Sequence, residues 1–258
     1  MNETALLAPK NSIGIFQDTQ LARLNLTRIP QHIALIPDGN RRWAKKRQSN
    51  PESGHREGAD TLMDIIKACQ EIGIKSLTVY SFSTENWSRS QEEIEALMAI
   101  YATYLLNNCE EMARTGIKLE TIGDVSRLPP FLNQIIQETK IATQHCQSVN
   151  LILALNYGAR DEMCRAFKLM LEDFSHNQLS LNDIDENIIS SYLDTSDWGD
   201  PELLIRTSGE YRISNFLLWQ LCYAEMYITP VLWPDFTPQH LLEAVIDYQS
   251  RERRWGGA

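Results

Sequence analysis

Short β-rich segments alternate with longer helical patterns along most of this 258-residue chain. The pattern contains no Asn-Gly hairpin, internal repeat or long linker, so it predicts one α/β domain whose six-stranded, mainly parallel sheet is flanked by helices. The predicted strands span residues 33–37, 76–82, 118–123, 150–154, 203–206 and 227–232. The predicted helices span residues 58–72, 91–114, 130–145, 161–174, 215–223 and 238–254. Residues 1–29 form an arm of uncertain order before a domain at 30–258.

Composition narrows the class of protein. An apolar fraction of 43% is enough for a full core in one large domain. The formal net charge of −10 argues against general nucleic-acid binding, which requires a broad basic surface. The five cysteines lack CxxC spacing, which favours buried thiols in a reducing compartment. No apolar run approaches ~18 residues and no signal-peptide pattern opens the chain, so we expect a cytoplasmic protein with at most peripheral membrane contact.

The most informative chemical motif follows the first predicted strand. The turn 38–40 leads from the apolar run 33–37 into residues 41–47, which have the composition of a helix start. Backbone N–H groups at such a start favour phosphate, and the Asp38 carboxylate is suited to hold Mg²⁺ against a diphosphate. Residues 38–56 carry six Arg or Lys and two acidic residues, a local charge of +4. The alternative is an ordinary βα turn with a solvated basic helix.

Two further loops carry polar side chains where parallel strands end. Residues 83–89 read Ser-Thr-Glu-Asn-Trp-Ser-Arg, and residues 206–215 contain Arg206 and Arg212 among hydroxyl side chains. Guanidinium groups and hydroxyls bind phosphate oxygens, so the second loop predicts another diphosphate site. The alternatives are a connection with Trp87 packed on the core and a surface salt-bridge loop. Because parallel strands end at one edge of a sheet, we expect the following loops to meet there: 38–42, 83–89, 156–160 and 206–214.

Three other features are ambiguous. Glu225 lies in an apolar run, where an acid pairs with a cation or binds a metal. His55 opens a helix, where it helps to bind phosphate or caps the helix, and Ser214 is positioned to cap the predicted helix 215–223. One apolar stripe has helical spacing and is either core or the wall of a deep cavity, namely Ile94, Leu97, Met98, Tyr101 and Leu105.

Six sequence blocks resemble those of the cis-prenyltransferases, most closely the bacterial undecaprenyl diphosphate synthases: HIALIPDGNRRWAKK, GHREGA, FSTENWSR, ALNYGARDE, LIRTSGEYRISNFLLWQLCYAEMY and VLWPDF. They follow the family's order from about residue 32 to 257. The resemblance implies a homodimer with an elongated hydrophobic tunnel. It also implies Mg²⁺-dependent condensation of isopentenyl diphosphate onto an allylic diphosphate, expected to be farnesyl diphosphate, with each new double bond cis. The implied product is a long polyprenyl diphosphate such as undecaprenyl diphosphate, the precursor of the lipid carrier for cell-wall polysaccharides.

The resemblance also assigns roles to single positions. Asp38 matches the aspartate that binds magnesium and assists loss of the allylic diphosphate, Asn86 matches the residue assigned as proton acceptor, and Glu225 matches a second magnesium ligand. The sequence 254–256 resembles a tail that reaches towards the partner subunit's site. The following positions match substrate-binding residues: Gly39, Asn40, Arg41, Arg42, Trp43, His55, Ser83, Thr84, Glu85, Trp87, Arg89, Arg206, Arg212, Ile213 and Ser214.

Three positions depart from the family pattern. Arg41 stands where many bacterial relatives have Gly, residues 50–53 lack a basic residue that many relatives carry, and Tyr211 stands where some have His. These departures put in doubt allylic binding through 50–53 and a further metal ligand at 211.

Competing functions lack sequence support. A nucleotide-phosphate enzyme of the P-loop type would carry GxxxxGK[ST], which is absent from the sequence. A trans-type prenyltransferase would be helical with Asp-rich motifs, and a non-catalytic prenyltransferase subunit would have lost the matched residues that this chain retains.

Overall fold

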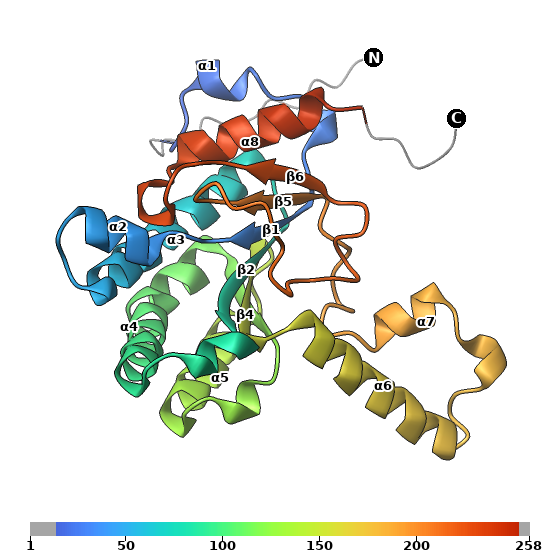
Figure 1. Ribbon diagram of the computed structural model, residues 1–258. Helices are drawn as coiled ribbons and strands as arrows, with labels where there is room; N and C mark the ends of the chain where they lie inside the picture. The colour runs from blue at the N-terminus through green and yellow to red at the C-terminus, as the bar shows by residue number, and fades with distance from the viewer. Residues whose placement is uncertain (1–13, 253–258) are drawn as a thin grey trace, which may run out of the picture.

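The computed structural model describes residues 14–252, and a six-stranded sheet lies at its centre. The strand order is β3-β4-β2-β1-β5-β6, and each neighbouring pair is parallel (Figure 1). The strands are β1 His32–Ile36, β2 Ser76–Ser83, β3 Ile117–Ile122, β4 Val149–Tyr157, β5 Leu203–Arg206 and β6 Glu225–Ile228. The predicted fold class, an α/β domain with a parallel sheet flanked by helices, is confirmed.

Helices connect the strands from β1 to β5, whereas the connection from β5 to β6, all of it described, contains no helix. The α-helices of the described residues are α1 Asp18–Leu21, α2 Asn40–Lys46, α3 Pro51–Ile72, α4 Gln91–Thr115, α5 Pro130–Thr143, α6 Ala159–Ser175, α7 Glu186–Ser191 and α8 Pro238–Ser250. Short 3₁₀-helices are η1 Leu26–Arg28, η2 Thr84–Ser88, η3 Val125–Arg127, η4 Leu181–Asp183 and η5 Trp233–Asp235. The long helices α3 and α4 end at Gly73 and Gly116, whose φ angles of 97° and 83° favour glycine.

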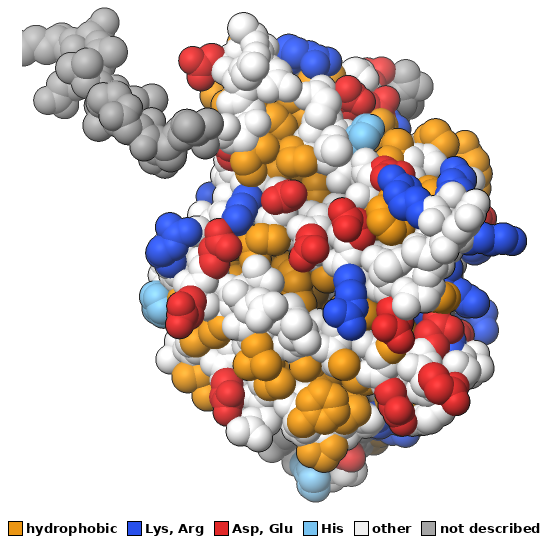
Figure 2. Space-filling model, turned by 90° about the vertical axis from the view of Figure 1, so that its left-hand side faces the viewer, with side chains coloured by type: hydrophobic (Ala, Val, Ile, Leu, Met, Phe, Trp, Pro, Cys, Tyr) orange, Lys and Arg blue, Asp and Glu red, His pale blue; other side chains and the backbone are white. Residues whose placement is uncertain are grey.

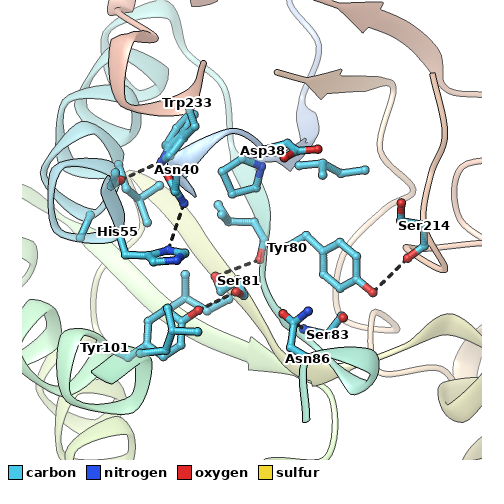
Figure 3. A pocket seen from close by; sticks show the side chains of 18 of the residues that line it. Asp38, Asn40, His55, Tyr80, Ser81, Ser83, Asn86, Tyr101, Ser214 and Trp233 are labelled. Carbon is cyan, nitrogen blue, oxygen red and sulfur yellow. Dashed lines mark hydrogen bonds between the residues drawn. The ribbon is translucent and has the colours of Figure 1, made fainter. Parts of the chain in front are cut away.

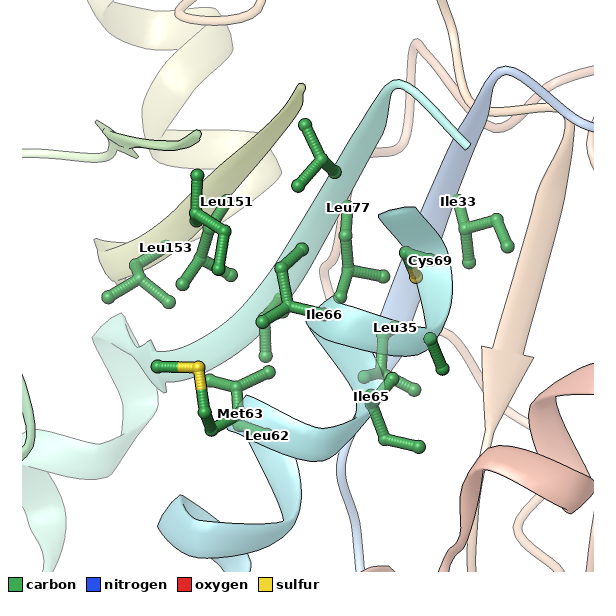
Figure 4. Close-up of a cluster of buried hydrophobic side chains, with 14 of the residues drawn as sticks. Ile33, Leu35, Leu62, Met63, Ile65, Ile66, Cys69, Leu77, Leu151 and Leu153 are labelled. Atoms are coloured by element: carbon green, nitrogen blue, oxygen red, sulfur yellow. The ribbon is translucent and has the colours of Figure 1, made fainter. Parts of the chain in front are cut away.

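Strand β1 is buried on both faces, and its alternate side chains belong to two different cores. Ile33 and Leu35 join the larger core, in which α3 packs apolar side chains on β1, β2 and β4 (Figure 4). Ala34 and Ile36 join a smaller core on the opposite face. A parallel strand covered on both faces is expected to be continuously apolar, which explains the sequence pattern. This central strand fixes where residues 37–40 emerge from the sheet.

The predicted helix over 215–223 is wrong, and Ser214 therefore caps no helix. Ser214, Asn215 and Leu217 have φ angles of 52°, 63° and 46°, a left-handed conformation that interrupts a right-handed helix. Phe216 and Leu217 are both fully buried in the smaller core. A regular helix would direct these successive side chains about 100° apart, so packing against the sheet overrides the helical pattern.

Other predicted boundaries also need correction. α3 begins at Pro51 rather than at residue 58, so His55 lies in its second turn rather than at its start. Asn50 caps this longer helix, because its side chain accepts the N–H of Ser53 at 3.0 Å. β6 spans Glu225–Ile228 rather than 227–232. All five cysteines are free thiols, but Cys164 and Cys222 are exposed rather than buried.

Part of the predicted arm 1–29 packs on the C-terminal helix. Gln20 donates to Gln239 of α8 at 2.6 Å, and Phe16 and Leu24 are buried in the larger core. Residues 1–13 and 253–258 lie outside the described residues, and the sequence 254–256 that resembles a family tail lies with them.

Two features of the described residues agree with the expectations from composition. None of the helices between residues 14 and 252 combines the length and the apolar character needed to cross a membrane. On the face in Figure 2, described acidic and basic side chains are interspersed with apolar ones, so this face has no continuous basic surface.

Candidate active site

A cavity of about 640 Å³ opens at the carboxyl edge of the sheet. The chain leaves β1 towards β2 on one side and leaves β5 towards β6 on the other, and such a reversal leaves a crevice where ligands bind. The loops after β1, β2 and β5 all contribute to the wall, as expected. The fourth expected loop, 156–160, lies behind the wall: Asn156 accepts a hydrogen bond from Trp87 Nε1 at 2.7 Å.

Asp38 is held at this crevice by contacts between the ends of β1 and β5. The backbone N–H of Asp38 donates to the Thr207 hydroxyl at 2.8 Å. The same hydroxyl donates its proton to the Asp38 carbonyl oxygen at 2.7 Å. The next residue, Gly39, precedes α2 with a φ of 113°, and a Cβ there would lie 2.9 Å from Ser208 Oγ. Glycine is therefore required both for the backbone angle and for the close approach of the two loops.

Three arginines surround the Asp38 carboxylate. Arg206 Nη2 donates to Oδ2 at 2.9 Å, Arg42 Nη2 donates to Oδ1 at 3.1 Å, and Arg212 Nη2 lies 4.0 Å from Oδ2. Glu210 pairs with both Arg42 and Arg212. Partial burial alone would raise the pKa of Asp38, but the hydrogen bonds and charges of Arg206 and Arg42 outweigh it and lower the pKa. The carboxylate is therefore ionised at neutral pH.

His55 faces the cavity from α3 as a neutral imidazole (Figure 3). Its Nδ1 lies 3.3 Å from the Asn40 amide nitrogen, which donates to it. Burial lowers the pKa of His55 to about 4, with the Arg89 and Arg41 charges acting in the same direction and Glu93 opposing them. Its Nε2 is buried without a hydrogen-bond partner among the described residues, so it is available to a bound molecule.

The loop after β2 forms the 3₁₀-helix η2, which fixes Asn86. Asn86 Oδ1 accepts the backbone N–H of Ser83 at 3.1 Å, and both residues line the cavity. Glu85 accepts a hydrogen bond from the Asn215 amide at 2.9 Å. Arg89 donates to Glu93 at 3.0 Å at the start of α4. Donor and acceptor groups of different loops thus converge at the opening.

The cavity becomes apolar with depth. Along α4 its wall continues from Leu97 through Ile100 and Tyr101 to Tyr104, which lies about 20 Å from the start of the helix at ~1.5 Å per residue. Tyr101 donates to the carbonyl oxygen of Ser81 at 2.5 Å (Figure 3), whereas no described residue bonds the Tyr104 hydroxyl. The stripe foreseen as core or cavity wall is both: Leu97 and Tyr101 line the cavity, and all five of its side chains pack in or against the larger core. An elongated tunnel stays a prediction.

Ten of the predicted site residues line the cavity: Asp38, Asn40, His55, Ser83, Glu85, Asn86, Arg89, Arg206, Arg212 and Ser214. The others lie around it, except Glu225, which lies apart from it. Arg42 contacts Asp38 from the first turn of α2, whereas the exposed Arg41 lies 4.0 Å from Glu93. Trp43 donates to Asp235 at 2.8 Å and stacks under Arg47, on the outer side of α2.

Three more of these residues, Trp87, Ile213 and Thr84, support the wall from behind. Trp87 packs edge-on against Phe82 while it bonds Asn156, which matches the alternative of a packed tryptophan. Ile213 packs against the smaller core, and Thr84 lies so near Gly158 that a Cβ there would meet its hydroxyl at 2.6 Å.

Glu225 and Asp38 do not meet within this chain. Glu225 is the first residue of β6 and pairs with Leu203, the first residue of β5. Asp38 instead follows the last residue of β1, which pairs with Arg206 at the other end of β5. The two residues are five strand positions apart, about 16 Å at ~3.3 Å per residue. Arg251 donates to Glu225 at 2.9 Å. A role for Glu225 as second metal ligand therefore stays a prediction.

Several cavity residues received no individual role from the sequence. Tyr80 and Asn215 line the opening, and Trp233 and Tyr104 line the interior. Tyr80 follows the strand alternation of β2, so its direction could have been inferred once the sheet was assigned. Asn215 enters the wall through an irregular loop and Trp233 through the short 3₁₀-helix η5, for both of which periodicity offers no signal.

The donor set at the opening suits Mg²⁺ bound together with a diphosphate. No cluster of three or more His, Cys, Asp or Glu converges within residues 14–252. Mg²⁺ is commonly bound through one or two carboxylates and the phosphates of a substrate. Asp38 provides one ionised carboxylate beside several phosphate-binding cations, which fits this mode of binding.

Comparisons with known proteins agree with the sequence blocks. The family model described as "Putative undecaprenyl diphosphate synthase" matches residues 36–256. Isoprenyl transferases from Chlamydia trachomatis serovar D and Clostridium tetani are 48% and 46% identical over 232 and 235 residues, covering 88% and 91% of this chain and 92% of each relative. The crystal structure of lavandulyl diphosphate synthase from Lavandula x intermedia, in complex with dimethylallyl diphosphate, superposes with a TM-score of 0.88 at 37% identity, covering 90% of this chain and 100% of that one.

These matches extend over most of the chain and coincide with the parallel sheet and the arginine-lined cavity. The chain therefore belongs to the cis-prenyltransferase family, the isoprenyl transferases that elongate prenyl chains.

Proposed function

We propose that the protein condenses isopentenyl diphosphate onto an allylic diphosphate, with farnesyl diphosphate as the starter, in a Mg²⁺-dependent reaction that forms cis double bonds. One observation carries the proposal: two arginine-bearing loops meet at Asp38, where an apolar cavity opens. A diphosphate with a hydrocarbon tail requires both features, because its head is anionic and its tail avoids water.

The allylic diphosphate binds at the start of α2. The first N–H groups of a helix lack intrahelical acceptors, so those of Asn40, Arg41 and Arg42 suit phosphate oxygens. Arg42 and Arg89 supply charge, and neutral His55 presents its free Nε2 nearby. The prenyl tail extends into the apolar part of the cavity, where each methylene-sized group buried contributes ~0.8 kcal/mol.

Isopentenyl diphosphate binds at the loop after β5. Arg212 lines the cavity with a side chain that is 58% exposed, so its guanidinium can engage a second diphosphate. The Ser214 hydroxyl lies 3.0 Å from Arg206 Nη1, which donates to it. Arg206 also donates to the carbonyl oxygen of Arg212 and to Asp38, and it thereby joins this loop to the first site.

The reaction breaks the bond between C1 of the allylic substrate and its diphosphate oxygen, and the electron pair leaves with the diphosphate. The double bond of isopentenyl diphosphate supplies the electrons of the new carbon–carbon bond, and a proton is then lost from its C2. The arginines stabilise the negative charge that develops on the leaving group. Mg²⁺ held by Asp38 would neutralise further charge on that diphosphate.

We also propose a part for Asn86 in the proton loss. Its Oδ1 already accepts the Ser83 N–H, so the side chain has a fixed orientation at the opening. An amide is a weak base, and we propose that Asn86 orients water or the released diphosphate as the proton acceptor.

Product size and assembly belong to the same proposal. The product is a polyprenyl diphosphate, with undecaprenyl diphosphate as the expected member, which serves cell-wall polysaccharide synthesis at the cytoplasmic side of the membrane. A cavity of about 640 Å³ lies within the ~300–1,000 Å³ typical for small ligands, so a much longer tail requires the wall near Tyr104 to move.

A homodimer is proposed through α6, which projects from the sheet (Figure 1). This helix exposes Phe167, Leu171 and Phe174 at helical spacing, an apolar stripe suited to a second copy of the chain.

Incorporation of radiolabelled isopentenyl diphosphate with farnesyl diphosphate and Mg²⁺ tests the proposal, and chromatography of the lipid gives the chain length. Asp38→Ala should abolish incorporation while the thermal unfolding curve stays cooperative. Asp64→Ala, which removes an exposed carboxylate from α3, is the matched control and should retain wild-type turnover. Near-normal turnover by Asp38→Ala would refute the role assigned to Asp38.

A further inference from the structure

Asn215 lies where the loops after β2, β4 and β5 meet. Its amide nitrogen donates to Glu85 Oε1 at 2.9 Å, and its amide oxygen accepts the backbone N–H of Arg160 at 3.0 Å. Its backbone oxygen accepts the N–H of Ala159 at 2.8 Å. Asn215 itself lines the cavity directly after Ser214. One residue thus connects the loops after β2 and β5, which line the opening, to the loop after β4 behind them.

The backbone around Asn215 adopts a conformation that most residues avoid. Asn215 has a φ of 63°, and its neighbours Ser214 and Leu217 also have positive φ angles. Such angles cost energy in non-glycine residues and persist when the surroundings determine them, although Asn tolerates them better than most residues do. The loop therefore depends on its contacts for its shape.

Two contacts hold this loop against β2. The Tyr80 hydroxyl donates to the Ser214 carbonyl oxygen at 3.2 Å (Figure 3), and the Tyr80 ring stacks on Phe216 with 4.4 Å between ring centroids. On the other side Gly158 leaves no spare room, because a Cβ there would lie 2.7 Å from the Asn215 amide nitrogen. The Asn215 amide is thus confined between Glu85 and the start of α6.

We propose that Asn215 is a positioning residue that fixes Ser214 and Arg212 relative to Glu85, and so sets the geometry of the isopentenyl diphosphate site. This inference rests on the proposed function of that loop. The Asn215 side chain must donate to a carboxylate and accept from an N–H at the same time. An amide does both, whereas a carboxylate of the same shape accepts the Arg160 N–H but repels Glu85.

The charge of Glu85 agrees with this arrangement. Partial burial would raise the pKa of Glu85, but hydrogen bonds, that from Asn215 first among them, lower it. Glu85 therefore stays ionised and remains a fixed acceptor for the Asn215 amide.

Steady-state kinetics of the full chain test the inference. Asn215→Asp should raise the KM for isopentenyl diphosphate about tenfold, the scale expected for one lost hydrogen bond, and change the KM for farnesyl diphosphate less than twofold. Asn177→Asp is the matched control, because Asn177 is exposed and has a similar φ of 58° at the end of α6. This control should leave both KM values unchanged.

A double-mutant cycle separates positioning through Glu85 from a general loss of structure. In a Glu85→Gln background the added Asn215→Asp change should raise the KM for isopentenyl diphosphate much less than tenfold, because the repulsion between two carboxylates is gone. If Asn215→Asp does not fold, Asn215→Gly tolerates the positive φ, removes both side-chain hydrogen bonds, and should show the same selective rise.

Unchanged KM values, or equal rises for both substrates, would overturn the positioning role. A wild-type protein without prenyl transfer would instead refute the proposed function itself.

Discussion

Two regions bring arginines to Asp38, and they are built in opposite ways. The first is regular: β1 leads through Gly39 into α2, which presents Arg42 with a side chain that is 45% exposed. The second is irregular: residues 207–217 follow β5 with several positive φ angles, and the side chain of Arg206, the last residue of β5, is only 4% exposed. The exposed arginine can turn towards a ligand, whereas the buried one is already fixed by Asp38, Ser214 and the backbone.

This difference in exposure indicates that the arginines have different roles. Arg206 uses its guanidinium nitrogens to hold the loop in place, so it prepares the site before a ligand arrives and little side-chain freedom is lost on binding. Arg42 and Arg212 pair with Glu210 at the surface and must exchange that partner for phosphate oxygens. Alanine variants of these three residues should therefore have kinetic defects of different magnitude and different substrate selectivity.

Arg206→Ala should have the largest effect. It removes the connection between Asp38 and the second loop, so kcat/KM should fall about 10²–10³-fold for both substrates. Steady-state kinetics with each diphosphate varied in turn provide the measurement, and Arg23→Ala, which truncates an exposed arginine, is the control. A defect confined to isopentenyl diphosphate would show that Arg206 serves one site alone.

Arg212→Ala should have a smaller and selective effect. Loss of one charge-assisted contact to phosphate should raise the KM for isopentenyl diphosphate about tenfold or more, with little change for farnesyl diphosphate. Arg42→Ala is its counterpart and should raise the KM for farnesyl diphosphate instead. Identical selectivity in the two variants would contradict the assignment of the two regions to two substrates.

Replacement of His55 should produce the smallest effect of the set, which we follow through the pH dependence of stability. The pKa of His55 is about 4 in the folded protein and near 6.5 when unfolded, so the unfolded chain binds the extra proton between these values. The stability that neutral His55 contributes is therefore complete above pH 6.5 and is lost as the pH falls towards 4.

Urea unfolding at pH 7.5 and pH 5 measures this loss. Between pH 7.5 and pH 5, the free energy of unfolding of the wild type should fall by about 1–2 kcal/mol more than that of His55→Gln. The pKa of buried His32 is also lowered, but His32 is present in both proteins and so cancels in the difference. Equal losses in the two proteins would show that His55 is readily protonated in the folded state.

The regular region could be predicted from the sequence, and the irregular one could not. The apolar run of β1, the turn at Gly39 and the basic composition of α2 are local signals that agree with the fold. Phe216 and Leu217 instead pack in the smaller core on the other face of the sheet. This long-range packing determines their conformation, although the local sequence pattern predicted a helix. Glu225 lies at the amino end of β6, away from the cavity, whether the strand begins at residue 227 as predicted or at residue 225 as observed.

A crystal structure with Mg²⁺, isopentenyl diphosphate and a non-hydrolysable farnesyl diphosphate analogue tests the central claim most directly, namely that two diphosphate sites flank Asp38 at the mouth of an apolar cavity. We expect the allylic diphosphate at the start of α2 with its tail between α3 and α4, and isopentenyl diphosphate at Arg212 and Ser214. A prenyl tail outside the cavity, or both diphosphates bound away from Asp38, would contradict the account.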